Sequence, residues 1–443
     1  MRSRFSTLLL FLFLITCGPL VYAAASPEAL ARLAVSDDAV ESARAVAELR
    51  RLGPEGLDAL IQTHREEIRH QISNPLLPAT AEWHRLSAAL DAVSQQKDSY
   101  LAGLYWYTDF AQAKAAARAT SKPILSLRLL GKLNEEFSCA NSRFFRTILY
   151  SNAEVSKMLR ERFVLHWQSV RPAPHITIDF GDGRRLERTV TGNSIHYILD
   201  SDGLPLNALP GLYGPAAFMR ALDETTEVFQ QLAKTGDVKL IQALSIYHRS
   251  RLNVINLAWL ADIEKIGGKI PEGLIVVKNE DGTPSALEVA SLATTKAVTE
   301  TSILRSMTAG SQALGTITDE AAWTKIAQLH MADAKLDARS IGLIERQTQR
   351  VFSSNHSKEK PEAALANLVH KLELNIALDT VRNEYLLHTK LHAWLIVDRS
   401  RSDLDELNKK VYAELFLTPA SDPWLGLFSP DTYMALENGG IVR

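Results

Sequence analysis

Between residues 105 and 236 the hydrophobic pattern changes repeatedly from a helical period to a strand period. An alanine-rich helical stretch is followed by Lys122-Pro123, which introduces a short apolar strand, and Ser138 is the expected N-cap of a helix that runs to about Tyr150. Helices that alternate with strands at this spacing predict an α/β sheet domain. The expected helices cover residues 109–120, 138–150, 153–162 and 215–234, and the expected strands cover residues 124–130, 163–170, 194–199 and 206–209.

An insertion of about fifteen residues separates the second and third of these strands. Ile176, Ile178 and Phe180 alternate with polar residues, Gly181-Asp182-Gly183 is typical of a turn, and apolar residues recur on the return. Residues 175–191 are therefore predicted to form a β-hairpin.

The segments on either side are mostly helical. In residues 26–95, Asp37 or Asp38 is placed to cap a helix that Gly53-Pro54 ends. The last two hundred residues are mostly helical, with one possible two-stranded interruption around Asp281-Gly282, a polar loop over 353–360 and a tail rich in turn formers after Pro419. The chain is thus divided into a leader (1–23), an N-terminal helical region (24–98), the α/β domain (99–236) and a mostly α-helical C-terminal domain (237–443).

The first 23 residues have the pattern of a secretory signal peptide. Arg2 and Arg4 precede an apolar run over 8–15, and small residues at the end suggest cleavage after Ala23. No later segment approaches the ~20 apolar residues of a membrane-spanning helix. We therefore expect export, most simply to the periplasm, with lipid attachment at Cys17 as the alternative.

Charge and cysteine content restrict the possible chemistry. The 49 Lys and Arg residues nearly balance the 51 Asp and Glu residues, so no global field points to nucleic acid or to an anionic membrane as a partner. Of the two cysteines, Cys17 lies in the leader, and cleavage would leave Cys139 as the only thiol. An intramolecular disulfide would then be impossible, so Cys139 is either inert and buried, intermolecularly bonded, or reactive.

Residues 105–222 resemble the thioredoxin superfamily, in particular its bacterial thioredoxin-like branch. The resemblance is carried by the helix at 109–118, the strand that begins Lys122-Pro123-Ile124-Leu125, the segment Cys139-Ala140-Asn141-Ser142, and the helix and strand that follow. It implies a central mixed sheet flanked by helices. It also implies that Cys139 and Ser142 stand at the two cysteine positions of the family's Cys-x-x-Cys motif.

Two departures from that family affect the expected chemistry. Ser142 replaces the resolving cysteine, so dithiol–disulfide cycling within one chain is excluded. The family's cis-proline is missing, because the corresponding stretch reads Gly192-Asn193-Ser194-Ile195. One hypothesis is single-thiol redox or exchange chemistry at Cys139, with a protein thiol as the partner. Ser142 and a helix N-terminus that favours the thiolate would assist it. The other is a non-catalytic scaffold or interaction module that binds a polypeptide.

Histidines provide the remaining candidate site residues. Glu384, His388 and His392 stand at four-residue intervals, and a carboxylate with two histidines can bind a metal ion. On an α-helix, however, the three positions drift by about 80°, which favours a polar stripe and no metal site. His166 and His196 lie in predicted strands as possible bases for Cys139 or as structural histidines. No phosphate loop, nucleophile elbow or haem-attachment motif is present, so no cofactor is predicted.

Overall fold

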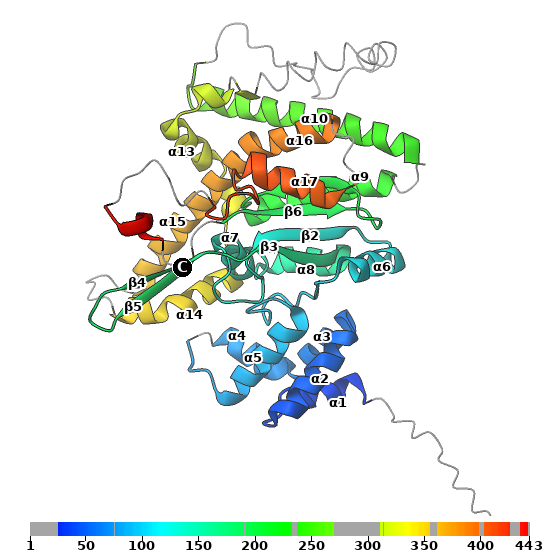
Figure 1. Cartoon of the computed structure of the whole chain (residues 1–443), viewed down its shortest axis with the longest axis vertical. Helices are drawn as coiled ribbons and strands as arrows, with labels where there is room; N and C mark the ends of the chain where they lie inside the picture. The colour runs from blue at the N-terminus through cyan, green and yellow to red at the C-terminus, as the bar shows by residue number, and fades with distance from the viewer. Residues whose placement is uncertain are drawn as a thin grey trace, which may run out of the picture.

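The N-terminal helices lie at one end of the long axis of the molecule and the central sheet follows them, while the C-terminal helices lie beyond the sheet and beside it (Figure 1). The structure is a computed structural model of the whole chain. It describes residues 25–74, 76–189, 192–232, 237–269, 311–312, 314–354, 361–397, 403–425 and 435–441. The predicted leader and the predicted two-stranded interruption around Asp281-Gly282 lie outside these residues.

The N-terminal helices enclose a hydrophobic core of their own. The side chain of Asp38 accepts hydrogen bonds from the N–H groups of Val40 and Glu41, which confirms the predicted cap. Gly53, at φ 73°, follows the end of the helix Ala39–Arg51, as predicted, and the helical residues after it are divided at His64. The helices are α1 (Pro27–Leu33), α2 (Ala39–Arg51), α3 (Pro54–Thr63), α4 (Arg65–Ser73) and α5 (Ala81–Ser94).

A mixed sheet of five strands, in the order β1-β3-β2-β6-β7, forms the centre of the molecule. β1 and β2 run parallel to β3, and β6 runs antiparallel to both β2 and β7. β2 is central and buried along its whole length, as its apolar sequence predicts. The sheet and its helices confirm the predicted α/β class. The strands are β1 (Trp106–Tyr107), β2 (Ile124–Leu130), β3 (Val164–Arg171), β6 (Ser194–Leu199) and β7 (Pro205–Pro210).

Helices cover both faces of this sheet. On one face, Arg128 of β2 reaches Asp405 at 3.4 Å, and Tyr197 of β6 donates a hydrogen bond to Asn408 at 3.3 Å. On the other face, the ring of His196 contacts Phe145 and Phe218. The first face carries α6 (Phe110–Thr120), α17 (Leu404–Lys410) and the π-helix η5 (Val411–Leu415), and the second carries α7 (Ala140–Phe144), the π-helix η1 (Phe145–Leu149), α8 (Ala153–Arg162) and α9 (Pro215–Leu232).

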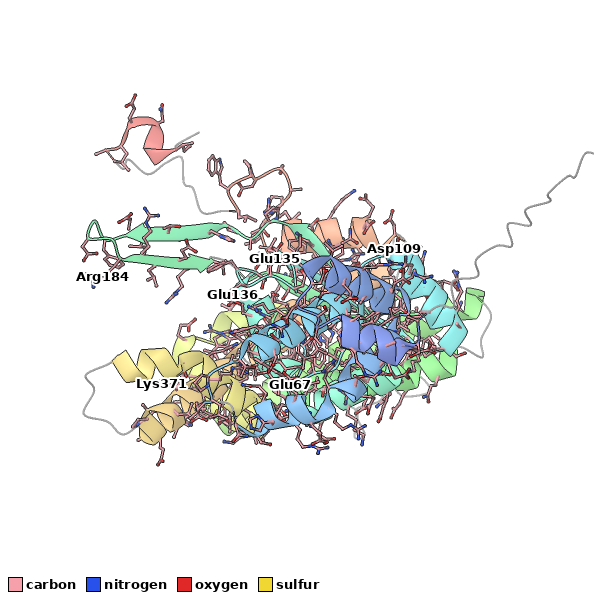
Figure 2. All side chains as sticks on the ribbon, turned by 90° about the horizontal axis from the view of Figure 1, so that it is seen from below. Glu67, Asp109, Glu135, Glu136, Arg184 and Lys371 are labelled. Carbon is pink, nitrogen blue, oxygen red and sulfur yellow. The ribbon has the colours of Figure 1, made fainter. Side chains whose placement is uncertain are left out.

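The predicted hairpin is present and projects from the body of the molecule, with Arg184 at its tip (Figure 2). It consists of β4 (His175–Asp179) and β5 (Arg185–Thr189), paired antiparallel. Gly181 and Gly183 supply the positive φ angles of the turn. The return strand ends before residues 190–191, which lie outside the described residues.

The C-terminal helices pack on the sheet domain and on one another. α10 lies along α16, and the ring of Trp259 stacks on Tyr385 with centroids 5.4 Å apart. A 3-10 helix lies between the helix that ends at Leu329 and the helix that begins at Ala338. The elements are α10 (Asp237–Lys265), α13 (Glu320–Leu329), η2 (Met331–Ala334), α14 (Ala338–Ser354), α15 (Pro361–Arg382), the π-helix η3 (Asn383–His388), α16 (Thr389–Val397) and η6 (Glu437–Gly440). Among the described residues, no helix combines the length and hydropathy needed to cross a membrane.

Candidate functional site

Cys139 lies at the N-terminus of the helix that follows β2. It is itself the N-cap of α7, a role that the sequence pattern assigned to Ser138. Its Sγ accepts a hydrogen bond from the N–H of Ser142 at 3.4 Å, and its own N–H donates to the carbonyl oxygen of Leu130. A sulfur at the N-cap satisfies one of the free N–H groups of the first turn, which explains why the helix begins one residue later than predicted.

The thiol of Cys139 is completely buried. Desolvation raises its pKa above the ordinary value, although the N–H groups of Ser142, Leu130 and Asn141 and the charge of Arg143 act in the opposite direction. Burial disfavours the thiolate, which is the nucleophilic form of cysteine. The helix N-terminus therefore favours the thiolate of Cys139, whereas the burial of the side chain disfavours it. The effect of burial is the larger of the two.

Ser142, the second predicted site residue, is buried beside Cys139. Only its backbone N–H reaches the sulfur; within the described residues its hydroxyl has no hydrogen-bond partner. The hydroxyl of Ser138 is likewise buried and without a partner there. The two residues thus meet as the spacing predicts, but the contact runs through the backbone.

The turn before β6, which contains Asn193, is contacted by the C-terminal part of the chain. The hydroxyl of Tyr412 donates to the carbonyl oxygen of Asn193 at 3.2 Å, and the Asn193 side chain donates to the hydroxyl of Thr418 at 3.0 Å. Burial raises the pKa of Tyr412, and Cys139 lies close enough for a thiolate there to raise it further. The C-terminal segment therefore covers the region around the thiol.

His166 and His196 are structural residues and not bases for Cys139. His166 Nδ1 lies 2.8 Å from the hydroxyl of Ser126, and His196 Nε2 lies 2.6 Å from the hydroxyl of Tyr150. Burial lowers the pKa of both imidazoles to about 3, with a smaller effect of Arg128 on His166. Both rings are therefore neutral hydrogen-bonding groups in the sheet.

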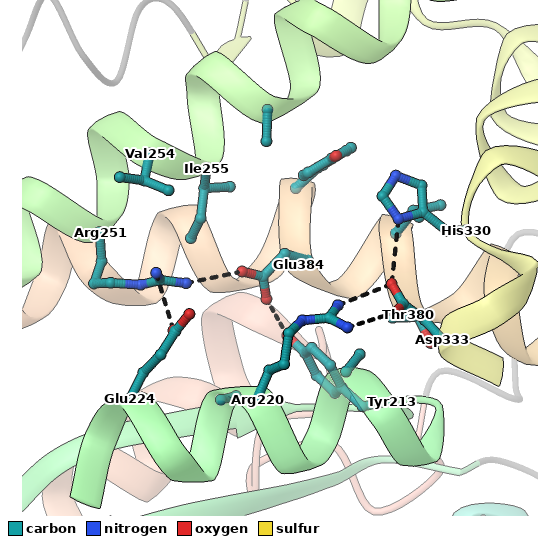
Figure 3. Close-up of a pocket in the computed structure, with 15 residues that line it drawn as sticks. Tyr213, Arg220, Glu224, Arg251, Val254, Ile255, His330, Asp333, Thr380 and Glu384 are labelled. Carbon is teal, nitrogen blue, oxygen red and sulfur yellow. Dashed lines mark hydrogen bonds and ion pairs between the residues drawn. The ribbon is translucent and has the colours of Figure 1, made fainter. Parts of the chain in front are cut away.

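A second candidate site is a pocket of about 200 Å³ between the sheet domain and the C-terminal helices (Figure 3). Its walls come from α9, α10, η2 and the junction of α15 with η3. The side chain of Arg220 is 58% exposed, so the pocket opens to solvent beside it. Charged and hydroxyl groups line the interior: Arg220, Glu224, Arg251, His330, Asp333, Glu384, Tyr213, Thr380 and Tyr385.

The charged groups of this pocket are arranged in pairs. Arg220 donates two hydrogen bonds to Asp333, at 2.6 and 2.9 Å, and Asp333 also lies 3.3 Å from His330. Arg251 lies between two carboxylates, 2.9 Å from Glu224 and 3.8 Å from Glu384 (Figure 3). Each charge therefore has an opposite charge beside it.

The protonation tendencies of the pocket differ from side chain to side chain. Burial raises the pKa of Glu224 despite the charge of Arg251, whereas in Glu384 the effect of burial is outweighed by His388 and Arg251 and the pKa is lowered. Hydrogen bonds from His330 to Asp262 and Asp333 raise the pKa of that imidazole to about 9. At neutral pH His330 is therefore a third cation of the pocket.

Glu384, His388 and His392 contact one another in sequence order. His388 Nδ1 lies 2.8 Å from Glu384, and the rings of His388 and His392 stack with centroids 4.1 Å apart. The segment from Asn383 to His388 is a π-helix, which has more residues per turn than an α-helix. Four residues make less than one turn of a π-helix and more than one turn of an α-helix. The step from Glu384 to His388 lies in the π-helix and the step from His388 to His392 lies in α16, so their rotations around the helix axis oppose each other.

The structure shows this stripe to be buried. His388 and His392 are 1% and 0% exposed, and Glu384 also accepts a hydrogen bond from the hydroxyl of Tyr213. No group of three or more His, Cys, Asp or Glu side chains in the described residues is arranged to hold a metal ion. The stripe is polar, as predicted, and one of its members, Glu384, lines the pocket.

The other charged residues of the pocket have no motif that sequence reasoning could have used. Arg220, Arg251 and Asp333 are separated by 31 to 113 positions in the sequence. Only the regular spacing of Glu384, His388 and His392 could be detected. No family model matches this chain, and no curated protein or solved structure matches it either.

Proposed function

We propose that residues 106–232 form a thioredoxin-like domain. The strand order β1-β3-β2-β6-β7, with three parallel strands followed by two antiparallel ones, supports this, because it is the order of thioredoxin sheets. The position of Cys139 at the start of the helix after β2 agrees with it.

In this proposal the C-terminal segment replaces one covering helix of the domain. Thioredoxin-like sheets carry a helix between the third and fourth strands, where this chain has the hairpin of β4 and β5. The side chains of Leu407, Val411 and Leu415 pack in the same core as the sheet. In this proposal α17 and η5 cover the part of the sheet that the missing helix would otherwise cover.

The domain acts as a scaffold for binding and not as a thiol catalyst. The observation that carries this conclusion is the burial of Cys139, whose sulfur is 0% exposed and whose pKa is raised by desolvation. Attack by a thiolate requires access to the sulfur. Ser142 cannot resolve a mixed disulfide, so the only exchange step left to the motif is the first attack of Cys139 on a disulfide. The burial of the sulfur blocks that attack.

The test is disulfide exchange with oxidised glutathione. The folded full chain carrying Cys17→Ser is incubated with it at neutral pH, and intact mass is followed over time, with the same chain carrying Cys139→Ser in addition as the blank. We expect no adduct on the folded protein. One glutathione per chain, formed as fast as on a free thiol, would overturn the scaffold function.

That outcome would instead support a second candidate function, single-thiol exchange. The hydrogen bond from the N–H of Ser142 to the sulfur favours it, because a helix N-terminus stabilises a thiolate. In the exchange the Cys139 thiolate would attack one sulfur of the disulfide and release the other half as a thiolate.

We further propose that the first 23 residues direct export. The basic start, apolar run and small residues before Ala24 support this. Expression of the full chain followed by N-terminal sequencing of the protein in the periplasmic fraction tests it. A mature N-terminus at Ala24 is expected, and a full-length chain retained in the cytoplasm would contradict it.

A further inference from the structure

The pocket beside Arg220 is shared by two parts of the chain. Tyr213 and Glu224 come from the sheet domain, whereas Arg251, Asp333 and Glu384 come from the C-terminal helices (Figure 3). Pockets at such junctions are common places for small ligands. The volume of about 200 Å³ is below the roughly 300–1,000 Å³ of drug-sized pockets, so the ligand must be small.

The balance of charge restricts what this ligand can be. Three carboxylates, on Glu224, Asp333 and Glu384, face three cations, on Arg220, Arg251 and His330. A singly charged ligand would form an ion pair with one of these groups and so separate that group from its partner. The partner would then be left as an uncompensated charge in a partly buried site, which costs free energy. An uncharged ligand leaves every pair intact.

The hydrogen-bonding capacity of the pocket points to hydroxyl groups. Each carboxylate oxygen can accept more than one hydrogen bond, and each guanidinium has five N–H donors, of which the buried Nε of Arg251 has no partner within the described residues. A hydroxyl both donates and accepts, so neighbouring hydroxyls can bridge an arginine and its carboxylate without separating them. Ala221, Val254 and Ile255 provide an apolar wall for carbon-bound hydrogens.

The local backbone also marks this wall as specialised. The π-helix from Asn383 to His388 carries Glu384 and Tyr385 into the pocket, and π-helical segments are frequent at functional sites. Behind the wall, His388 lies between Glu384, at 2.8 Å, and Asn207, at 3.0 Å. This buried contact fixes the orientation of the Glu384 carboxylate.

We propose that this pocket binds a small, uncharged, polyhydroxylated molecule of the size of one monosaccharide. Arg251, Glu224 and Glu384 hold its hydroxyls, and the apolar wall packs against its carbon skeleton. The inference does not depend on Cys139 or on the proposed scaffold function.

Calorimetric titration of the full-length protein tests this. The probes are D-glucose, D-galactose, D-mannose and myo-inositol, with glycine as a zwitterion and inorganic phosphate as an anion. Saturable binding of at least one hydroxylated probe and of neither charged one is expected. Binding of glycine or phosphate alone, or of no probe at all, would overturn the proposal.

Two variants tie the binding to this pocket. Arg251→Met should lower the affinity for the hydroxylated probe by about tenfold or more. Ala221→Leu fills the pocket without touching a charge and should abolish binding, which keeps the test valid if the first variant fails to fold. Arg118→Met, which removes an exposed ion pair with Asp202, is the control and should bind as the wild type does. Unchanged affinity in Ala221→Leu would contradict the proposal.

Discussion

The hydroxyl of Tyr412 donates a hydrogen bond to the carbonyl oxygen of Asn193, 219 positions earlier in the sequence. This contact fastens the C-terminal segment to the turn before β6. The same tyrosine lies within electrostatic range of Cys139. Tyr412 and Cys139 belong to one hydrophobic core, so we expect the burial of the thiol to depend on this tertiary contact as well as on the local fold.

Removal of the Tyr412 ring should uncover Cys139. Tyr412→Ala is expected to cost about 3–5 kcal/mol in the free energy of unfolding and to raise the native-state alkylation rate of Cys139. Tyr412→Phe loses only the hydrogen bond and should cost about 1 kcal/mol without a change in alkylation. Leu222→Ala, a buried change in α9, controls for general destabilisation. Equal alkylation rates in Tyr412→Ala and Leu222→Ala would disprove the covering role.

Arg128 should be dispensable for stability despite its burial. Burial lowers its pKa, its side chain is 3% exposed, and its partner Asp405 is 72% exposed and can be solvated without it. Arg128→Met is therefore expected to change the free energy of unfolding by no more than about 1 kcal/mol, or to stabilise the protein. The neighbouring Leu127→Ala should cost about 2–5 kcal/mol. Chemical denaturation of both variants checks this, and comparable losses would refute it.

Stability should depend on pH through His330. Its pKa is raised from 6.5 to about 9, so the stabilisation is complete below about pH 6.5 and is lost as the pH rises through 9. The difference in unfolding free energy between wild type and His330→Gln should be about 2–3 kcal/mol larger at pH 6 than at pH 10. Denaturation at both pH values measures it. A difference that stays constant with pH would show that His330 is not charged in the folded protein.

Alanine substitutions at two helical glycines, Gly56 and Gly342, should have opposite effects on the stability of the protein. A Cβ at Gly56 would lie 1.9 Å from the carbonyl oxygen of Leu49, so Gly56→Ala must push α3 away from α2 and destabilise the protein. A Cβ at Gly342 in α14 meets nothing within 4 Å, so Gly342→Ala should stabilise it by about 0.5–1 kcal/mol. Thermal unfolding of the two variants compares them. A stabilised Gly56→Ala would mean that α2 and α3 are packed less closely.

Local patterns allowed much of the fold to be predicted. The apolar run of β2, the alternation in β6 and the Asn152-capped helix α8 occur at the predicted residues. Each of these depends on near neighbours in the chain. The cap at Cys139 was missed because Ser138 is the commoner capping residue, and a sulfur acceptor was not considered.

The pocket and the cover over the thiol could not be predicted for a different reason. Both arise where segments distant in sequence meet, such as Arg220 with Asp333 and Tyr412 with Asn193. The π-helix at Asn383–His388 also has no sequence signature that separates it from an α-helix. It begins at the residue before Glu384 and ends at His388, so the turn that carries this pair differs from the α-helix that the spacing predicts.

The most direct measurement is the alkylation of Cys139 by iodoacetamide at neutral pH, in the folded full chain carrying Cys17→Ser and after denaturation, so that Cys139 is the only thiol. If the domain is a closed scaffold, the folded protein stays unlabelled while free cysteine is consumed, and one label per chain appears only in denaturant. Labelling of the folded protein at the rate of free cysteine would contradict the burial of the thiol and the scaffold function built on it.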